Sequence, residues 1–180
     1  MRRVLALGAV LLASGVWVGC AEWPTKTPSE VRRSSDGPIE LDDGRRVTVA
    51  FTEQGLVERH QGAEGGPWSK PRVLHPAAGD SECDPELTTY DNTVAVMADW
   101  DYGCYGDAAE IAIVAVSDGD LDEWDTHGIE NIDGWEWTRF SWSGYRVVFR
   151  KGDGDGTTEL NWRQSIGFTG PDVIAGPGEG

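Results

Sequence analysis

Apolar residues recur at every second position in several segments of the chain. The segments 47–52 and 94–97 alternate apolar residues with polar or small ones. A period of two places successive side chains on opposite faces of a β-strand. No stretch carries the 3.6-residue apolar stripe of a helix over three turns. The pattern therefore predicts a domain that consists almost entirely of β-strands.

Two further segments refine this prediction. The run from Ile111 to Val116 is almost continuously apolar, as expected of a strand that is buried on both faces. The strand expected at 146–150 lies between Ser143-Gly144 and the segment 152–156, which contains only Gly and Asp. Gly and Asp tolerate the positive φ of tight hairpin turns. We therefore expect neighbouring antiparallel strands joined by short turns.

Three units of similar content follow one another, each with an alternating strand, a turn and a second strand near a Trp. They run from Val47 to Trp68, from Val94 to Trp124 and from Arg146 to Trp162. Blades of β-propellers recur at about 40 to 50 residues. We predict an all-β domain over residues 39–168, an antiparallel meander of propeller-like blades. A β-sandwich is the alternative, because a usual propeller needs at least four blades.

The segments Gly66–Pro71 and Asp118–Trp124 each place a turn beside a Trp. This combination of a turn and a Trp loosely resembles the sequence pattern of sialidase-like β-propellers with Asp-boxes. The resemblance implies a bladed fold and, as an alternative function, a glycan-directed hydrolase. A glycosidase mechanism uses two carboxylates, for which the candidates are Asp99, Asp101, Glu110 and Glu136.

The N-terminus has a different character. Two arginines precede an apolar run over residues 4–18, which is shorter than the roughly 20 residues of a transmembrane helix. This run ends at Gly19 and Cys20, so residues 1–19 have the outline of a signal peptide. Val18-Gly19-Cys20 resembles the lipobox of bacterial lipoproteins. The resemblance implies cleavage before Cys20 and a diacylglyceryl group on its thiol, and the alternative is ordinary secretion.

We therefore expect a protein held at the extracytoplasmic face of a cell membrane, because two acyl chains give stable anchoring. Residues 20–38 are rich in Pro, Ser, Thr and charge, and they predict a flexible tether after the lipidated Cys20. Residues 169–180 contain several Gly and two Pro, and they predict a flexible tail.

The formal net charge of −16 limits the partners. Proteins that bind nucleic acid present basic patches to phosphates, so a nucleic-acid partner is not expected. Acidic proteins are also repelled by anionic bilayers, so attachment should depend on the lipid. The expected partners are the bilayer, through Cys20, and an envelope protein or glycan. Open sheet edges would allow pairing with another chain, and the oligomeric state is left open.

The three cysteines are expected to have two different roles. If Cys20 carries the lipid, Cys83 and Cys104 remain in an oxidising compartment, and we expect a disulfide between them. In the chain-entropy model such a bridge contributes about 3 kcal/mol to stability. A cysteine-based metal site is disfavoured, because the chain has no CxxC and no His nearby.

Acidic turns give only weak calcium candidates. Asp118, Asp120 and Asp122 have the spacing of the first three ligands of a calcium loop, but Glu123 stands where an EF-hand requires Gly. A different calcium turn is conceivable there or at Asp153 and Asp155. We expect no cofactor.

Tryptophan supplies the candidate binding residues. Trp135 and Trp137 are expected on one face of a strand, with Trp142 following Phe140 in a second alternating pair. Aromatic residues in strands usually fill the core, but an exposed aromatic face would bind a sugar ring or an apolar partner. His60, His75 and His127 lack metal-site spacing, and GxSxG and HExxH motifs are absent. We therefore predict a non-catalytic binding module on an exported lipoprotein.

Overall fold

A computed structural model describes residues 31–35, 37–76, 83–100, 109–132, 134–153 and 156–175. These residues form thirteen β-strands and no helix, so the predicted all-β class is confirmed. Because the described residues contain no helix, none of them forms a helix that could cross a membrane.

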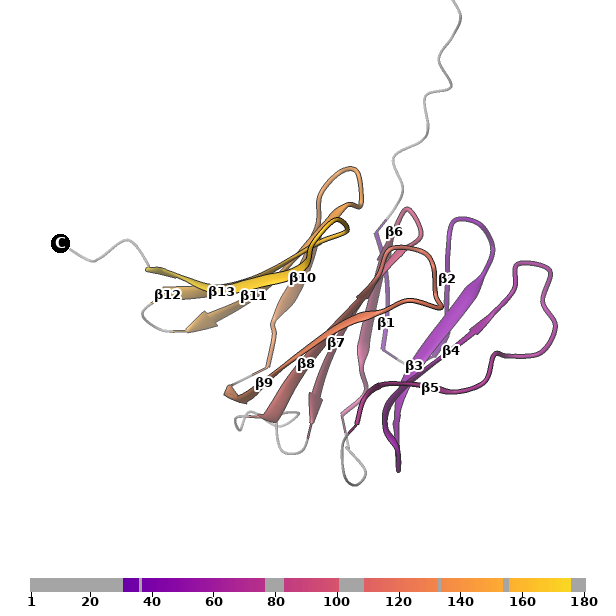
Figure 1. Cartoon of the computed structure of the whole chain (residues 1–180), viewed down its shortest axis with the longest axis horizontal. Coiled ribbons are helices and arrows are strands. Elements are labelled where there is room, and N and C mark those ends of the chain that lie inside the picture. The colour runs from indigo at the N-terminus through magenta and orange to yellow at the C-terminus, as the bar shows by residue number, and fades with distance from the viewer. Residues whose placement is uncertain are drawn as a thin grey trace, which may run out of the picture.

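The strands form three antiparallel sheets that stand in a row (Figure 1). The first sheet contains β2 (Ile39–Glu40), β3 (Arg46–Thr52), β4 (Gly55–Gln61) and β5 (Arg72–His75). The middle sheet contains β1 (Arg32–Ser34), β6 (Glu86–Tyr90), β7 (Thr93–Trp100), β8 (Ala109–Ser117) and β9 (Asp125–Ile132). The third sheet contains β10 (Trp137–Phe140), β11 (Arg146–Asp153), β12 (Gly156–Arg163) and β13 (Gly167–Ala175). Four consecutive strands in each sheet are neighbours in sequence order, so each sheet contains an antiparallel meander.

The sequence repeat corresponds to these sheets. Val47, Val94 and Val147 are each the second residue of the second meander strand in their sheet, and each is fully buried. The alternating segments that begin the three predicted units are thus equivalent strands, β3, β7 and β11. In each sheet this valine belongs to a core shared with a neighbouring sheet.

The middle sheet is buried on both faces. Val96 and Ile113 belong to a core with the first sheet, whereas Met97 and Val114 belong to a second core with the third sheet. Alternate residues of β7 and β8 therefore both enter an apolar environment, which explains the continuous apolar run from Ile111 to Val116. The first core includes Val47, Val49, Leu56 and Leu74, and the second includes Trp135, Phe149, Leu160 and Trp162.

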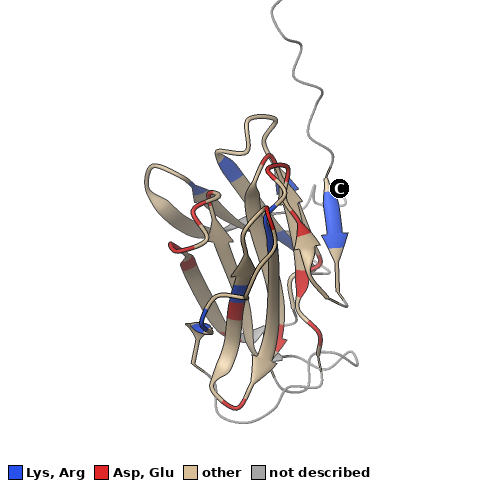
Figure 2. Ribbon diagram, turned by 90° about the vertical axis from the view of Figure 1, so that its right-hand side faces the viewer, with Lys and Arg blue, Asp and Glu red and all other residues tan. Residues whose placement is uncertain are grey.

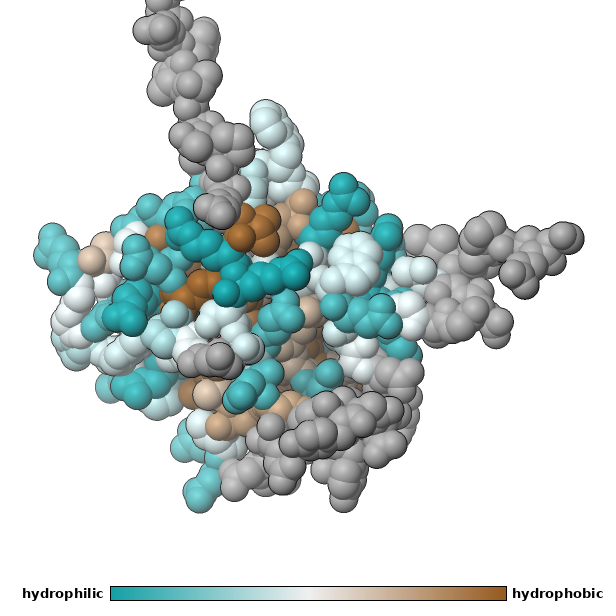
Figure 3. Space-filling view, turned by 180° about the vertical axis from the view of Figure 1, so that it is seen from behind, coloured by the Kyte–Doolittle hydropathy of each residue, from teal (hydrophilic) through white to brown (hydrophobic). Residues whose placement is uncertain are grey.

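The two end sheets keep a polar outer face. Arg46 and Thr48 alternate with buried Val47 in β3, and Arg146 and Val148 alternate with Val147 and Phe149 in β11. Acidic and basic residues are interspersed on the side formed by the first sheet (Figure 2). Seen from behind, the surface shows hydrophobic residues only in small areas between hydrophilic ones (Figure 3).

The predicted tether is wrong in its last part. Arg32–Ser34 forms β1, which pairs antiparallel with β6 at the edge of the middle sheet. Arg32 also donates a 2.7 Å hydrogen bond to the Glu40 carbonyl and forms an ion pair with Asp42 at 3.0 Å. Backbone pairing and charge hold this strand in place. Its sequence has no alternation of apolar residues, so the period-two pattern did not reveal it.

The predicted tail is also wrong in part, because β13 extends to Ala175 and pairs with β12. Thr169, Gly170 and Pro171 have the composition of a turn. Proline donates no ladder hydrogen bond and is tolerated at a sheet edge. β13 is such an edge, so Pro171 lies within a strand.

Candidate functional site

A shallow pocket of about 210 Å³ lies on the outer face of the third sheet. We call it the arginine pocket. Cross-strand pairing places Trp137 opposite Arg150 and Arg150 opposite Glu159, so these side chains form one row across the sheet. The pocket is lined by Trp137, Arg139, Phe140, Ser141, Arg146, Val148, Arg150 and Glu159.

The first row of the pocket is fixed by contacts among its own members. The guanidinium of Arg150 lies over the Trp137 ring, with its carbon 4.7 Å from the ring centroid. Arg150 also forms an ion pair with Glu159, a carboxylate that is buried in the sheet face. Stacking on an indole and pairing with a buried carboxylate both restrict a guanidinium. The row is therefore preorganised.

A second row adds positive charge. Arg146 donates from Nε and Nη2 to Oδ1 of Asn161, at 3.1 and 2.5 Å. Arg163 lies directly opposite Arg146 in the ladder, and like charges in such positions repel. Arg139 is exposed beside them. Four arginines thus share a face with one described buried carboxylate, Glu159, although the whole chain has a net charge of −16.

The three candidate tryptophans have separate environments, so the expected shared indole face is wrong. Trp135 is buried in the second core, 6.3 Å from the Phe149 ring centroid. β10 begins only at Trp137, so the strand alternation does not extend back to Trp135. Trp137 lines the arginine pocket, whereas Trp142 lies in the β10–β11 turn with 91% of its surface exposed.

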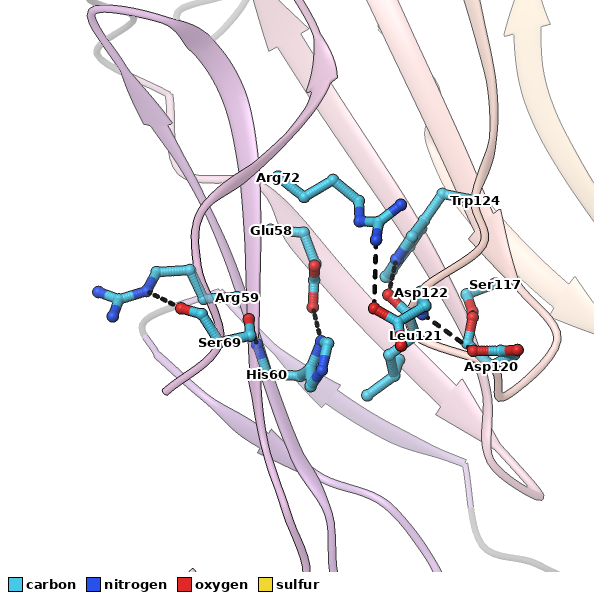
Figure 4. Close-up of polar contacts among 10 residues, drawn as sticks. All are labelled: Glu58, Arg59, His60, Ser69, Arg72, Ser117, Asp120, Leu121, Asp122 and Trp124. Atoms are coloured by element: carbon cyan, nitrogen blue, oxygen red, sulfur yellow. Dashed lines mark hydrogen bonds and ion pairs between the residues drawn. The ribbon is translucent and has the colours of Figure 1, made fainter. Parts of the chain in front are cut away.

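A second polar cluster lies where the first sheet meets the β8–β9 turn (Figure 4). Glu58 of β4 is fully buried, and its Oε1 lies 2.9 Å from Nδ1 of His60. Arg72 of β5 forms a 3.2 Å ion pair with Asp122 above them. A pocket of about 430 Å³ borders this cluster and is lined by Glu58, His60, Ser69, Lys70, Pro71, Arg72 and Asp122.

Burial governs the electrostatics of this cluster. It raises the pKa of Glu58, while the hydrogen bond from His60 and its charge act in the opposite direction. Oε2 of Glu58 is buried without a hydrogen-bond partner among the described residues. Glu58 therefore holds its proton more tightly than an exposed glutamate does, beside His60 where the first sheet meets the β8–β9 turn. Sequence analysis missed this pair, although Leu56, Glu58 and His60 alternate on one face of β4.

The weak calcium candidates are occupied by other contacts. Asp118 accepts from the backbone N–H of Asp120 at 3.3 Å and from Gln164 at 2.7 Å. Asp120 accepts from the N–H of Asp122 at 3.1 Å, and Asp122 pairs with Arg72. Over the part of the chain that the structure describes, no three His, Cys, Asp or Glu side chains are placed to hold a metal ion. The Asp153 side chain and all of Asp155 lie outside the described residues.

The two described carboxylates of the hydrolase hypothesis, Asp99 and Glu136, contact different glycines. Asp99 of β7 packs directly against Gly134, and burial raises its pKa to about 6. Glu136 lies instead beside Gly152 of β11. Asp101 and the Glu110 side chain lie outside the described residues.

The cysteine predictions stay predictions. Cys83 is the residue three positions before β6, but Cys20 and Cys104 lie outside the described residues. The lipid anchor at Cys20 and the Cys83–Cys104 disulfide are therefore expectations from sequence.

Comparisons with protein-family models, with curated proteins and with solved structures found no match to this chain.

Proposed function

We propose that the protein is an exported lipoprotein, anchored through Cys20, whose β-domain binds an envelope protein or glycan at the arginine pocket. The signal-like segment 1–19 and the lipobox-like Val18-Gly19-Cys20 support the anchor. An extracytoplasmic location follows from that segment, with secretion as the alternative.

The preorganised row of Trp137, Arg150 and Glu159 is the observation that carries the binding proposal. Tryptophan and arginine are the side chains most often found at binding hot spots. A site on a sheet face loses little conformational freedom when it binds, which favours affinity. This row therefore has the chemistry and the rigidity of a recognition surface.

The same geometry favours binding over hydrolysis at this pocket. Glu159 is the single carboxylate among the residues that line it, and Glu159 is already paired with Arg150. A usual glycosidase needs two carboxylates on either side of the scissile bond. The pocket offers a sugar or a peptide an indole edge, guanidinium donors and Ser141, which are groups for recognition.

In a Cys20→Ala background, which removes the lipid as a second means of attachment, Trp137→Ala is expected to weaken binding of the protein to isolated envelope fractions of its source cells by roughly tenfold or more. The indole is both a contact surface and the platform that orients Arg150. Co-sedimentation over a range of protein concentrations measures the effect.

Trp68→Ala is the matched control, because Trp68 also stacks with an arginine, Arg46, but on the outer face of the first sheet, with a carbon-to-centroid distance of 5.8 Å. It should bind as wild type does. Equal binding by wild type and a folded Trp137→Ala variant would refute the proposed site.

A further inference from the structure

Exposed hydrophobic side chains gather at one end of the third sheet. Trp142, Tyr145 and Ile166 expose 91%, 64% and 60% of their surface. Trp142 and Tyr145 lie in the β10–β11 turn, and Ile166 lies in the β12–β13 turn. The Gln164 N–H donates to the Tyr145 carbonyl at 3.1 Å and joins the two turns. We call these three side chains the hydrophobic tip.

The hydrophobic tip lies at the end of the domain where the chain from Cys20 enters. Arg32, the first residue of β1, pairs with Thr89 in β6. The next residue of β6, Tyr90, donates from its hydroxyl to the Trp142 carbonyl at 2.8 Å. In Figure 1 the β6–β7 hairpin and the β10–β11 turn reach the same end of the molecule. Val31, just before β1, is also half exposed.

The chain between anchor and domain is short. Residues 21–30 separate Cys20 from Val31, and a fully extended chain of this length spans at most about 40 Å. If Cys20 carries the lipid, as the proposed function requires, the tip end of the domain is held within that distance of the bilayer.

The tip has the chemistry of the membrane interface. Tryptophan and tyrosine are enriched at the level of lipid head groups, where one part of the ring is wet and the other apolar. Arg146 begins β11 directly after Tyr145, and Arg163 ends β12 directly before the second turn. Guanidinium groups in these positions suit lipid phosphates. Zwitterionic lipids also carry phosphate groups, so this attraction does not need an anionic bilayer.

We propose that the hydrophobic tip rests in the head-group region of the anchoring bilayer and gives the tethered domain a fixed orientation. The strands of the third sheet then stand on the membrane, and the arginine pocket on their outer face opens beside it. A protein partner on the tip, or a second copy of the chain, is the competing occupant that the experiment distinguishes.

The test uses the full-length protein, purified from its source cells, in phosphatidylcholine vesicles whose acyl chains carry bromine, a short-range quencher of indole fluorescence. The emission that Trp142→Phe removes from wild type belongs to Trp142, and bromine near the head-group end of the acyl chains should reduce it, because an indole at the membrane interface lies close to those bromines. The emission that Trp137→Phe removes serves as the control and should stay unchanged, because Trp137 lies at the other end of β10.

Flotation of the same vesicles tests the anchor separately. Protein that fails to float would count against the proposed lipoprotein itself. Protein that floats while the Trp142 emission is unaffected by bromine would overturn the docking proposal alone, in favour of another occupant. A double variant, Tyr145→Ser with Ile166→Ser, should float normally and show less quenching of Trp142.

Discussion

Replacing Phe149 with alanine is expected to lower the free energy of unfolding by about 3 to 5 kcal/mol. Phe149 is fully buried in the core between the middle and third sheets. Its ring centroid lies 6.3 Å from that of Trp135 and 6.2 Å from that of Phe168. The substitution removes these contacts and leaves a cavity. Urea unfolding followed by circular dichroism measures the loss.

Small domains unfold with about 5 to 15 kcal/mol, so the Phe149→Ala change would remove a large share of the total. Tyr145→Ala, four residues earlier and mostly exposed, is the control and should change stability by no more than about 0.5 kcal/mol. Similar small effects of both substitutions would mean that the third sheet does not pack on the middle sheet as described.

Replacing His60 with alanine is expected to cost about 2 to 4 kcal/mol near pH 8, because it leaves the buried Glu58 carboxylate without its partner. Burial raises the pKa of Glu58 above its ordinary 4.5. The folded protein therefore holds this proton more tightly than the unfolded chain does, and stability falls as pH rises from 4.5 through the raised value. His60 lowers this pKa, so its loss should enlarge the total fall in stability and extend it to higher pH.

The difference between wild type and His60→Ala should consequently shrink as the pH falls toward 4.5, because the raised pKa of Glu58 favours its protonated form there, and a neutral carboxyl depends less on His60. Chemical unfolding near pH 8 and near pH 5 measures both differences. Glu58→Gln removes the charge, and in that background His60→Ala should cost much less. An equal cost in both backgrounds and at both pH values would show that the pair has no electrostatic role.

The strands that sequence analysis identified are those whose side chains alternate between a core and a polar environment, or face two cores. Val47, Val94 and Val147 mark equivalent strands, because the second meander strand of each sheet contributes to a core shared with a neighbouring sheet. The apolar run from Ile111 to Val116 correctly indicated a central strand, because β8 contacts a core on each side.

Elements held mainly by backbone pairing escaped detection. β1 consists of two arginines and a serine, and the sheet edge that it covers is specified by β6 rather than by its own pattern. β13 contains Pro171. Proline is typical of turns, so this strand can be recognised only once its position at the edge of the sheet is known. Such strands depend on partners distant in sequence.

The candidate site could be predicted only in part. Trp137 and Trp142 were identified from their residue type, but the arginines of the pocket come from β10, β11 and β12 and meet only through strand register. Glu58 was missed because an acidic residue within a strand usually faces solvent. Its alternation with Leu56 placed it on the core face, and this signal was available in the sequence.

The most direct test of the lipoprotein proposal is the intact mass of the protein in membrane and medium fractions of its source cells, for wild type and for Cys20→Ala. We predict a membrane-bound wild-type chain that begins at Cys20 and carries the added mass of a diacylglyceryl group, with both features lost in the variant. A wild-type chain that is released without lipid would contradict the anchor, and the orientation of the domain on the bilayer would fall with it.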